Sequence, residues 1–206
     1  MLSCGVGTVL AAPLSSQLTP LELQQAMQGE VVIHALDTQG QPGSSFEVFK
    51  LMQVGLPALY ATLTCYQDYS RFMPNVERLE VRPQSVSSVD ADYYLALPMK
   101  QSKRYRLRLQ AEESVGRAQI RWKQIPWPEV ALKDSIADTQ GSWQLQANSP
   151  EQTWVKYQVY TDPGPIPFGL GWIVDVLTRV SLPDVLNSTE GFAVRGEVSC
   201  RQAAGA

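Results

Sequence analysis

The residue types that most often carry catalysis are scarce in this chain. The sequence has a single histidine, His34, and three cysteines, Cys4, Cys65 and Cys200. A Ser-His-Asp triad would have to use His34, and no G-x-S-x-G nucleophile motif is present. A metal site needs several clustered ligands, which one histidine and scattered acids do not supply. The sequence therefore predicts no catalytic residues, no metal site and a structural or surface role for His34.

Two further signatures are weak. The three cysteines have no metal-like spacing, and the favoured interpretation is free thiols, with Cys65 inside a helix. A Cys65–Cys200 disulfide is the alternative. Residues 169–174 resemble the beginning of a dinucleotide-binding fingerprint, but the third glycine is missing and no strand follows to complete a β-α-β unit. We therefore expect no cofactor.

The aromatic residues are more informative. The chain has five tryptophans and eight tyrosines, largely in segments that alternate apolar and polar residues, as strands with one buried face do. Aromatics on the concave side of a curved sheet can line a pocket, because they combine apolar area with a few polar atoms. The residues alone leave open the alternative that these side chains fill the interior.

The elements that hold these aromatics follow in a regular order. A capping box at residues 19–22 predicts a short helix to about Gln28, with Gly29 as its cap. Residues 30–36 and 46–54 predict a hairpin. Further predicted elements are a helix at 56–68, strands at 76–82, 93–98, 104–112, 117–124, 142–147 and 155–159, and, after a proline-rich corner, an apolar helix at 168–180.

Three segments resemble a known family. Residues 68–81 (DYSRFMPNVERLEV), 141–145 (GSWQL) and 153–168 (TWVKYQVYTDPGPIPF) are similar to segments of START-like proteins, in particular the polyketide cyclase and coenzyme-Q-binding branch. The match spans about residues 30–190. The chain departs from the family in its first 29 residues, in the long connection at 125–140 and at Pro183, which interrupts the family's final helix.

This resemblance implies an α+β helix-grip fold. A curved antiparallel sheet of about six to seven strands would wrap around a long C-terminal helix, with a short helical segment after the first hairpin. Residues 1–29 would form an N-terminal arm, which ends in the short helix, residues 30–195 the START-like domain, and residues 196–206 a tail.

The resemblance also implies binding or transport of a hydrophobic small molecule, such as a lipid, quinone or polyketide, in an internal cavity. We expect a non-enzymatic protein with the final helix as a lid. The alternatives are a polyketide cyclase or aromatase, which needs a general acid or base in the pocket, and a structural or interaction domain with a filled core. The expected ligand-binding residues are Tyr69, Phe72, Tyr93, Leu95, Tyr105, Leu107, Trp122, Trp143, Tyr157, Trp172 and Val176.

Charge argues against nucleic acid as a partner. The net charge is −3 and the isoelectric point is about 5.2, whereas nucleic-acid binders usually have a basic excess. Asp90 and Asp92 are expected to flank a turn, in solvent. Positive residues alternate along two strands and could contact an anionic membrane surface peripherally; the favoured interpretation is a solvated outer face paired with acids such as Glu112 and Glu113. These residues are Arg104, Arg106, Arg108, Arg121 and Lys123.

The N-terminal residues bear on location. Residues 4–13 resemble the end of an export signal, with small residues where a signal peptidase needs them. No basic segment precedes them, and the first Lys or Arg is Lys50, so an apolar arm is the alternative. The sequence favours export, to a periplasm or out of the cell, over a cytoplasmic location.

Overall fold

One antiparallel sheet organises the molecule. The computed structural model describes residues 12–85, 87–97, 100–164 and 181–200, and within them eight strands pair in the order β1-β2-β8-β7-β6-β5-β4-β3. The sequence predicted about six to seven strands. The eight strands are β1 (Val32–Leu36), β2 (Ser44–Met52), β3 (Val76–Pro83), β4 (Ser88–Leu97), β5 (Gln101–Ser114), β6 (Arg117–Ile125), β7 (Asp138–Ser149) and β8 (Gln152–Asp162).

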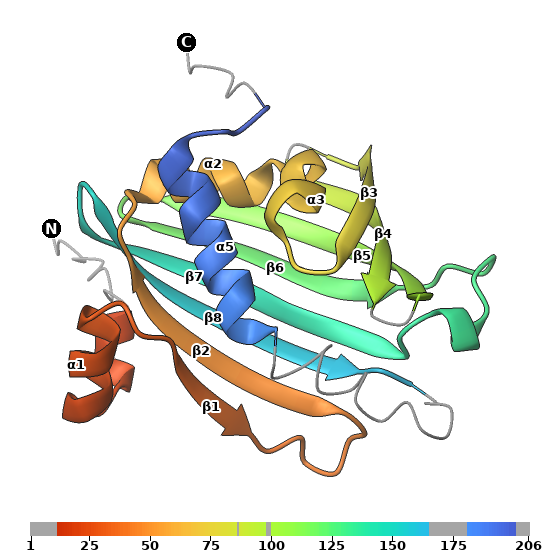
Figure 1. Cartoon of the computed structure of the whole chain (residues 1–206), viewed down its shortest axis with the longest axis horizontal. Helices are drawn as coiled ribbons and strands as arrows, with labels where there is room; N and C mark the ends of the chain where they lie inside the picture. The colour runs from red at the N-terminus through yellow and green to blue at the C-terminus, as the bar shows by residue number, and fades with distance from the viewer. Residues whose placement is uncertain (1–11, 86, 98–99, 165–180, 201–206) are drawn as a thin grey trace, which may run out of the picture.

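Helices cover one face of this sheet. In Figure 1, α2, α3 and α5 lie in front of the strands, and α1 lies beside β1 and β2. This is the α+β helix-grip arrangement that the sequence predicted. The α-helices are α1 (Pro20–Met27), α2 (Leu56–Thr64), α3 (Tyr69–Phe72) and α5 (Leu182–Arg195), and the 3-10 turns are η1 (Leu14–Gln17), η2 (Tyr66–Asp68) and η4 (Leu132–Asp134).

The capping box of α1 is confirmed. The Thr19 hydroxyl accepts a hydrogen bond from the Glu22 N–H, and the Glu22 carboxylate accepts one from the Thr19 N–H at 2.9 Å. Hydrogen bonds from the Thr19 N–H and hydroxyl, and then from His34, lower the pKa of Glu22 to about 2. His34 Nε2 lies 2.8 Å from Glu22 Oε1. His34 therefore holds α1 against the sheet.

Strand β2 buries residues on both of its faces. On β2, Val48 and Met52 pack with α2 and α5, whereas the alternate residue Phe49 packs with Leu14 and Trp154 under the N-terminal arm. Successive side chains of a strand point to opposite faces. The arm therefore covers the outer face of the sheet at β2 and β8.

The predicted helix over residues 56–68 is interrupted. Helix α2 ends at Thr64, and Cys65 leaves the helical region with ψ at 70°. Cys65 forms a disulfide with Cys200, so the expectation of free thiols is wrong. The two cysteines are 135 positions apart, and closing so long a loop removes about 5 kcal/mol of conformational entropy from the unfolded chain.

Pro183, which was expected to interrupt the final helix, lies at the beginning of the last helix that the structure describes. Pro183 lies in the first turn of α5, where the missing proline N–H leaves no helical hydrogen bond unmade. Leu186 and Phe192 are fully buried against the sheet and α3. The apolar helix predicted over residues 168–180 lies outside the described residues.

Candidate ligand-binding site

A cavity of about 150 Å³ lies between the concave face of the sheet and the helices. The residues that line it come from strands β3 to β8, from the segment Tyr69–Val76, from the β6–β7 connection and from the beginning of α5. The site is therefore inside the grip, where the sequence predicted it.

Most of the residues singled out from the sequence lie around this cavity. Phe72 does not line it: its ring stacks on Phe192 with 4.7 Å between centroids, which joins α3 to α5. Trp172 and Val176 lie outside the described residues. The lining includes Tyr69, Tyr93, Leu95, Tyr105, Leu107, Trp122, Trp143 and Tyr157.

Sequence reasoning missed several lining residues. The turn after α3 contributes Met73, Pro74 and Asn75; Asn75 has a φ of 62°, which asparagine tolerates better than most residues. The connection between β6 and β7 contributes Ile136. The sequence of this connection has no periodic pattern that would have indicated a buried residue. Strand alternation could have found five further members, because they share a face with predicted lining residues: Leu109, Ile120, Thr139, Val159 and Thr161.

The aromatic rings are stacked in two groups. The rings of Tyr93 and Tyr105 are nearly parallel, 5.1 Å apart at 7°. The Trp122 ring lies 5.5 Å from Tyr157 at 24°, and the Trp143 ring lies 4.4 Å from Tyr157. Such offset or tilted contacts are favourable aromatic geometries. They hold flat walls in place around the cavity.

The tyrosines of the cavity stay protonated at neutral pH. Burial raises the pKa of Tyr69, Tyr93, Tyr105 and Tyr157 above its ordinary value. The Tyr69 hydroxyl donates a hydrogen bond to the Leu63 carbonyl at 2.7 Å. Among the described residues, the hydroxyls of the other three have no hydrogen-bond partner. Three O–H groups at the cavity are thus free to bond a ligand.

A small polar group lies at one end of the cavity. The hydroxyls of Thr139 and Thr161, which face each other across β7 and β8, are 3.1 Å apart, and Thr139 donates to the Tyr160 carbonyl. Nearby, Gln124 Nε2 donates to the Ile136 carbonyl at 3.1 Å. The Gln124 Oε1 atom is buried without a partner. The two threonine hydroxyls line the cavity and can bond a polar atom of a ligand at this end.

No charged side chain is among the described residues that line the cavity. The described part of the chain also holds no group of three or more His, Cys, Asp or Glu residues that could bind a metal ion. A buried ion without a partner is strongly disfavoured. The cavity as described therefore suits an uncharged molecule.

Three of the five positive residues singled out on β5 and β6 form ion pairs, which agrees in part with the favoured interpretation. Arg121 pairs with Glu112. Asp90 and Asp92, expected in solvent beside a turn, are instead buried on β4, because they face the arginines of the next strand. Arg108 donates to Asp90 at 2.8 Å and 2.9 Å, and Arg106 donates to Asp92.

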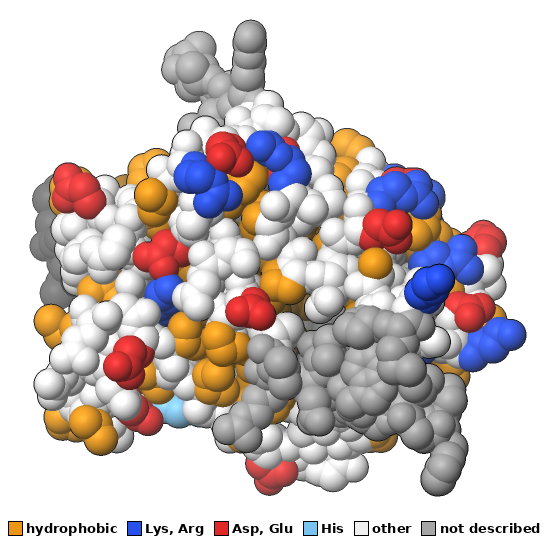
Figure 2. Space-filling model, in the orientation of Figure 1, with side chains coloured by type: hydrophobic (Ala, Val, Ile, Leu, Met, Phe, Trp, Pro, Cys, Tyr) orange, Lys and Arg blue, Asp and Glu red, His pale blue; other side chains and the backbone are white. Residues whose placement is uncertain are grey.

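The opposite face of the molecule is mixed in charge. In Figure 2, positive and negative side chains lie next to one another around α5 and α3, with hydrophobic side chains between them.

None of the described helices is long and apolar enough to cross a membrane.

Comparisons with known proteins bear on the fold. No protein-family model matches the sequence, and no curated protein of similar sequence was found. Solved structures do match. A STAR-related lipid transfer protein from Xanthomonas axonopodis has 15% identity and a TM-score of 0.65, over 80% of this chain and 93% of that one. Human StAR-related lipid transfer protein 5 has 13% identity and a TM-score of 0.66, over 88% and 97%.

An enzyme is among the similar structures. The Zhui aromatase/cyclase from Streptomyces sp. R1128 has 11% identity and a TM-score of 0.60, over 80% of this chain and 95% of that one. Likeness at such low identity shows the fold alone. The chain has the START-like helix-grip fold that its sequence predicted, and the finer assignment to a coenzyme-Q-binding branch stays a prediction.

Proposed function

We propose that this protein binds a compact, uncharged hydrophobic molecule in its cavity and acts as a carrier. The observation that supports this most is the cavity itself, which is walled by stacked aromatic rings and, among its described residues, lacks charge. Two of the solved structures with this fold are named as lipid transfer proteins. A completely filled core would leave no such space.

The size of the cavity limits the ligand. A cavity of about 150 Å³ is the size at which an apolar protein interior takes up benzene. The aromatic rings that line the cavity favour a flat, aromatic molecule. We therefore propose a ligand of one or two fused rings, or the ring end of a larger molecule; a two-chain lipid would require the cavity to enlarge.

The unpaired hydroxyls suggest where the ligand is polar. Tyr93, Tyr105 and Tyr157 keep their protons, since burial raises the pKa of each. A hydroxyl that keeps its proton can donate a hydrogen bond. A ligand with carbonyl or hydroxyl oxygens would accept such hydrogen bonds. Among lipids, quinones and polyketides, the last two fit this pattern best.

The ionisable side chains that line the cavity favour a carrier over a cyclase. Proton transfer at neutral pH needs a group with a pKa near 7. Among the described lining residues the ionisable side chains are tyrosines, whose pKa is raised by burial. None of them would accept a proton at neutral pH. We therefore propose that the ligand leaves the protein chemically unchanged.

Thermal unfolding with matched ligands tests the binding. We expect 2-acetylnaphthalene to raise the melting temperature more than 2-ethylnaphthalene, which has the same carbon skeleton without the carbonyl oxygen, because a ligand of the native state alone stabilises it. Phosphatidylcholine should have little effect. Val159→Phe, inside the cavity, should abolish the shift, and Val194→Phe, at a position 60% exposed on α5, should preserve it.

Two results would contradict the proposal. If neither naphthalene derivative changes the melting temperature, binding in the cavity is rejected. If mass spectrometry recovers a polyketide-like ligand with a changed mass after incubation with catalytic amounts of protein, the carrier role is rejected and the cyclase alternative is favoured.

A further inference from the structure

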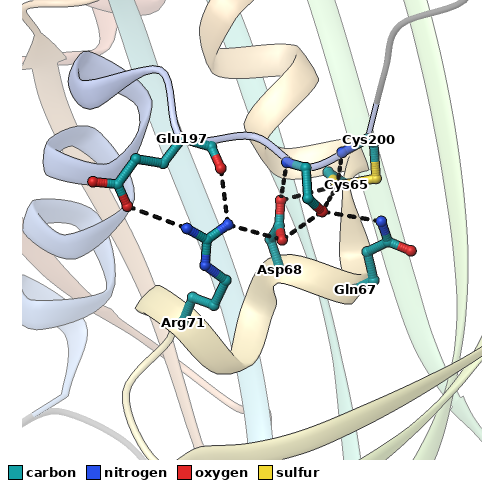
Figure 3. A network of polar contacts seen from close by, with 7 residues as sticks. Cys65, Gln67, Asp68, Arg71, Glu197 and Cys200 are labelled. Atoms are coloured by element: carbon teal, nitrogen blue, oxygen red, sulfur yellow. Dashed lines mark hydrogen bonds and ion pairs between the residues drawn. A yellow bond between two sulfur atoms is a disulfide. The ribbon is translucent and has the colours of Figure 1, made fainter.

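The chain that follows α5 is fastened to the wall of the cavity. Gly196, with a φ of 65°, ends α5 and turns the chain toward η2 and α3. Figure 3 shows residues 197–200 lying across these turns. The disulfide between Cys200 and Cys65 is the covalent part of this attachment. We name residues 197–200, with their contacts to residues 65–71, the tail clamp.

Asp68 is the polar centre of the tail clamp. Its carboxylate accepts hydrogen bonds from the Ser199 N–H and the Ser199 hydroxyl, each at 2.7 Å. Arg71 donates to Asp68 at 3.2 Å and to the Glu197 carbonyl at 2.8 Å. Asp68 is only 3% exposed. The tail is thus held by one covalent bond and by a buried hydrogen-bonded group.

The segment under the clamp forms one wall of the cavity. Tyr69, Met73 and Asn75 line the cavity, and Phe72, between them, stacks on Phe192 of α5. Helix α3 has only four residues, and so short a helix is not stable without outside contacts. The position of this wall therefore depends on the clamp.

The two cysteine residues differ in exposure. Cys65 is 1% exposed, whereas Cys200 is partly exposed and borders a surface cleft of about 400 Å³ between α2 and the strands β4 and β5. Tyr66 and Gln67 also line this cleft. A thiolate from outside can approach Cys200 but not Cys65.

We propose that the Cys65–Cys200 disulfide is a redox-cleavable latch on this wall of the cavity, opened by a dithiol that attacks Cys200. The inference rests on the proposed binding function. A thiolate of the dithiol bonds to Cys200 Sγ, the disulfide breaks, and its electron pair goes to Cys65 Sγ, which takes up a proton. The second thiol then displaces Cys200 as a thiol. The dithiol is oxidised to a disulfide, and the protein gains two electrons and two protons.

Asp68 slows this reaction. Its Oδ2 atom lies 3.1 Å from Cys65 Sγ, and a nearby negative charge disfavours the thiolate that must leave. Once protonated, the Cys65 thiol can donate to the same carboxylate. The latch therefore resists weak reductants but has a stable open form.

The variant Cys200→Ser tests the latch, because this single substitution at the partly exposed cysteine removes the disulfide. We expect the oxidised protein to release 2-acetylnaphthalene more slowly than either Cys200→Ser or the protein reduced with dithiothreitol, by several-fold. Release is followed by stopped-flow tryptophan fluorescence, since Trp122 and Trp143 line the cavity. Equal rates in all three forms would overturn the latch and leave the binding function standing.

Hydrogen exchange separates the latch from the binding function. Amides of residues 66–75 should exchange several-fold faster in Cys200→Ser than in the oxidised protein, with or without a ligand. If the probe binds to none of the forms, the binding function fails and this exchange alone decides the latch: faster exchange supports it and unchanged exchange rejects it.

Asp68→Asn tests the protecting role of the carboxylate. At one pH, dithiothreitol should release thiols from folded Asp68→Asn several-fold faster than from the unsubstituted protein. The difference should disappear in concentrated urea, where the two side chains no longer lie together. Equal rates in the folded state would remove Asp68 from the proposal.

Discussion

The indole of Trp122 lies over Gly141, the residue opposite it on β7, and so reaches the ring of Tyr157 on β8. A Cβ atom at position 141 would lie 2.4 Å from Trp122 and 2.2 Å from the Gln158 carbonyl oxygen. A side chain at position 141 and the Trp122–Tyr157 contact are therefore mutually exclusive. One glycine makes this aromatic wall.

Gly141→Ala should destabilise the protein. The new methyl group would collide with backbone as well as with the indole, and overpacking of this kind typically costs about 1–3 kcal/mol. We expect a loss in that range in the free energy of unfolding, measured by urea denaturation. We also expect a change in the near-ultraviolet circular dichroism, because Trp122 must move.

Gly191→Ala is the matched control. Gly191 lies inside α5, and a Cβ atom there would meet only the end of the Arg195 side chain, at 3.4 Å. Alanine is favoured over glycine in a helix interior by up to about 1 kcal/mol. We expect this variant to be more stable than the natural chain. Equal losses in the two variants would contradict the role given to Gly141.

Tyr157→Phe should separate binding from stability. Its hydroxyl has no partner among the described residues, so its removal should leave the free energy of unfolding within about 0.5 kcal/mol of the natural value. Affinity for 2-acetylnaphthalene should fall, and affinity for 2-ethylnaphthalene should not. Isothermal titration with both ligands measures this.

Tyr69→Phe serves as the control for Tyr157→Phe. The Tyr69 hydroxyl donates to the Leu63 carbonyl, and the loss of a hydrogen bond that leaves a buried acceptor unpaired costs roughly 1–3 kcal/mol. This variant should lose stability. The substitution should not change the affinity for one of the two ligands more than the affinity for the other. The reverse pattern would show that the hydroxyls have been assigned the wrong roles.

Local patterns in the sequence predicted most of the sheet. Alternation in residues 104–112 and 117–124 identified β5 and β6, and the capping box identified the beginning of α1. The sequence contains a signal that could have corrected the placement of Asp90 and Asp92 beside a turn. These acids alternate with Ala91 and Tyr93, which is the pattern of a strand rather than of a turn.

Long-range features were less accessible. The spacing of Cys65 and Cys200 says nothing about their distance in space, which depends on the path of α5 and the tail. The role of Pro183 depends on where a helix begins, and proline is tolerated at that end alone. The turn residues Met73 and Asn75 lack a periodic pattern, and their segment is placed by contacts with residues distant in the sequence, among them Phe192 of α5.

The stabilising effect of Asp68 should depend on acidity. Burial alone would raise the pKa of Asp68, but hydrogen bonds from Ser199 and Arg71 outweigh burial and lower it. A lowered pKa means that the stabilisation is present above the unfolded pKa of about 3.9 and is lost as the pH falls through the folded pKa. The difference in unfolding free energy between the natural chain and Asp68→Asn should therefore shrink below about pH 4. A constant difference from pH 6 to pH 2 would contradict this assignment.

The last prediction concerns the ion pair that fastens α5 to β2. Lys50 Nζ lies 2.5 Å from Glu190 Oε2 and 2.6 Å from Asn187 Oδ1, and the Lys50 side chain is 6% exposed. Removing one partner of a buried ion pair typically costs about 3–5 kcal/mol, because the other charge is left without compensation. Glu190 still accepts a hydrogen bond from the Gln53 N–H at 2.6 Å, so we expect Lys50→Met to lose about 3 kcal/mol of unfolding free energy, measured by urea denaturation.

Lys50→Met combined with Glu190→Met should recover much of this loss, since apolar pairs often replace buried ion pairs without penalty. Arg195→Met, which breaks an exposed pair with Glu197, should change stability by less than about 1 kcal/mol. If the double variant is no more stable than Lys50→Met, the loss comes from packing of the lysine stem and not from the uncompensated carboxylate.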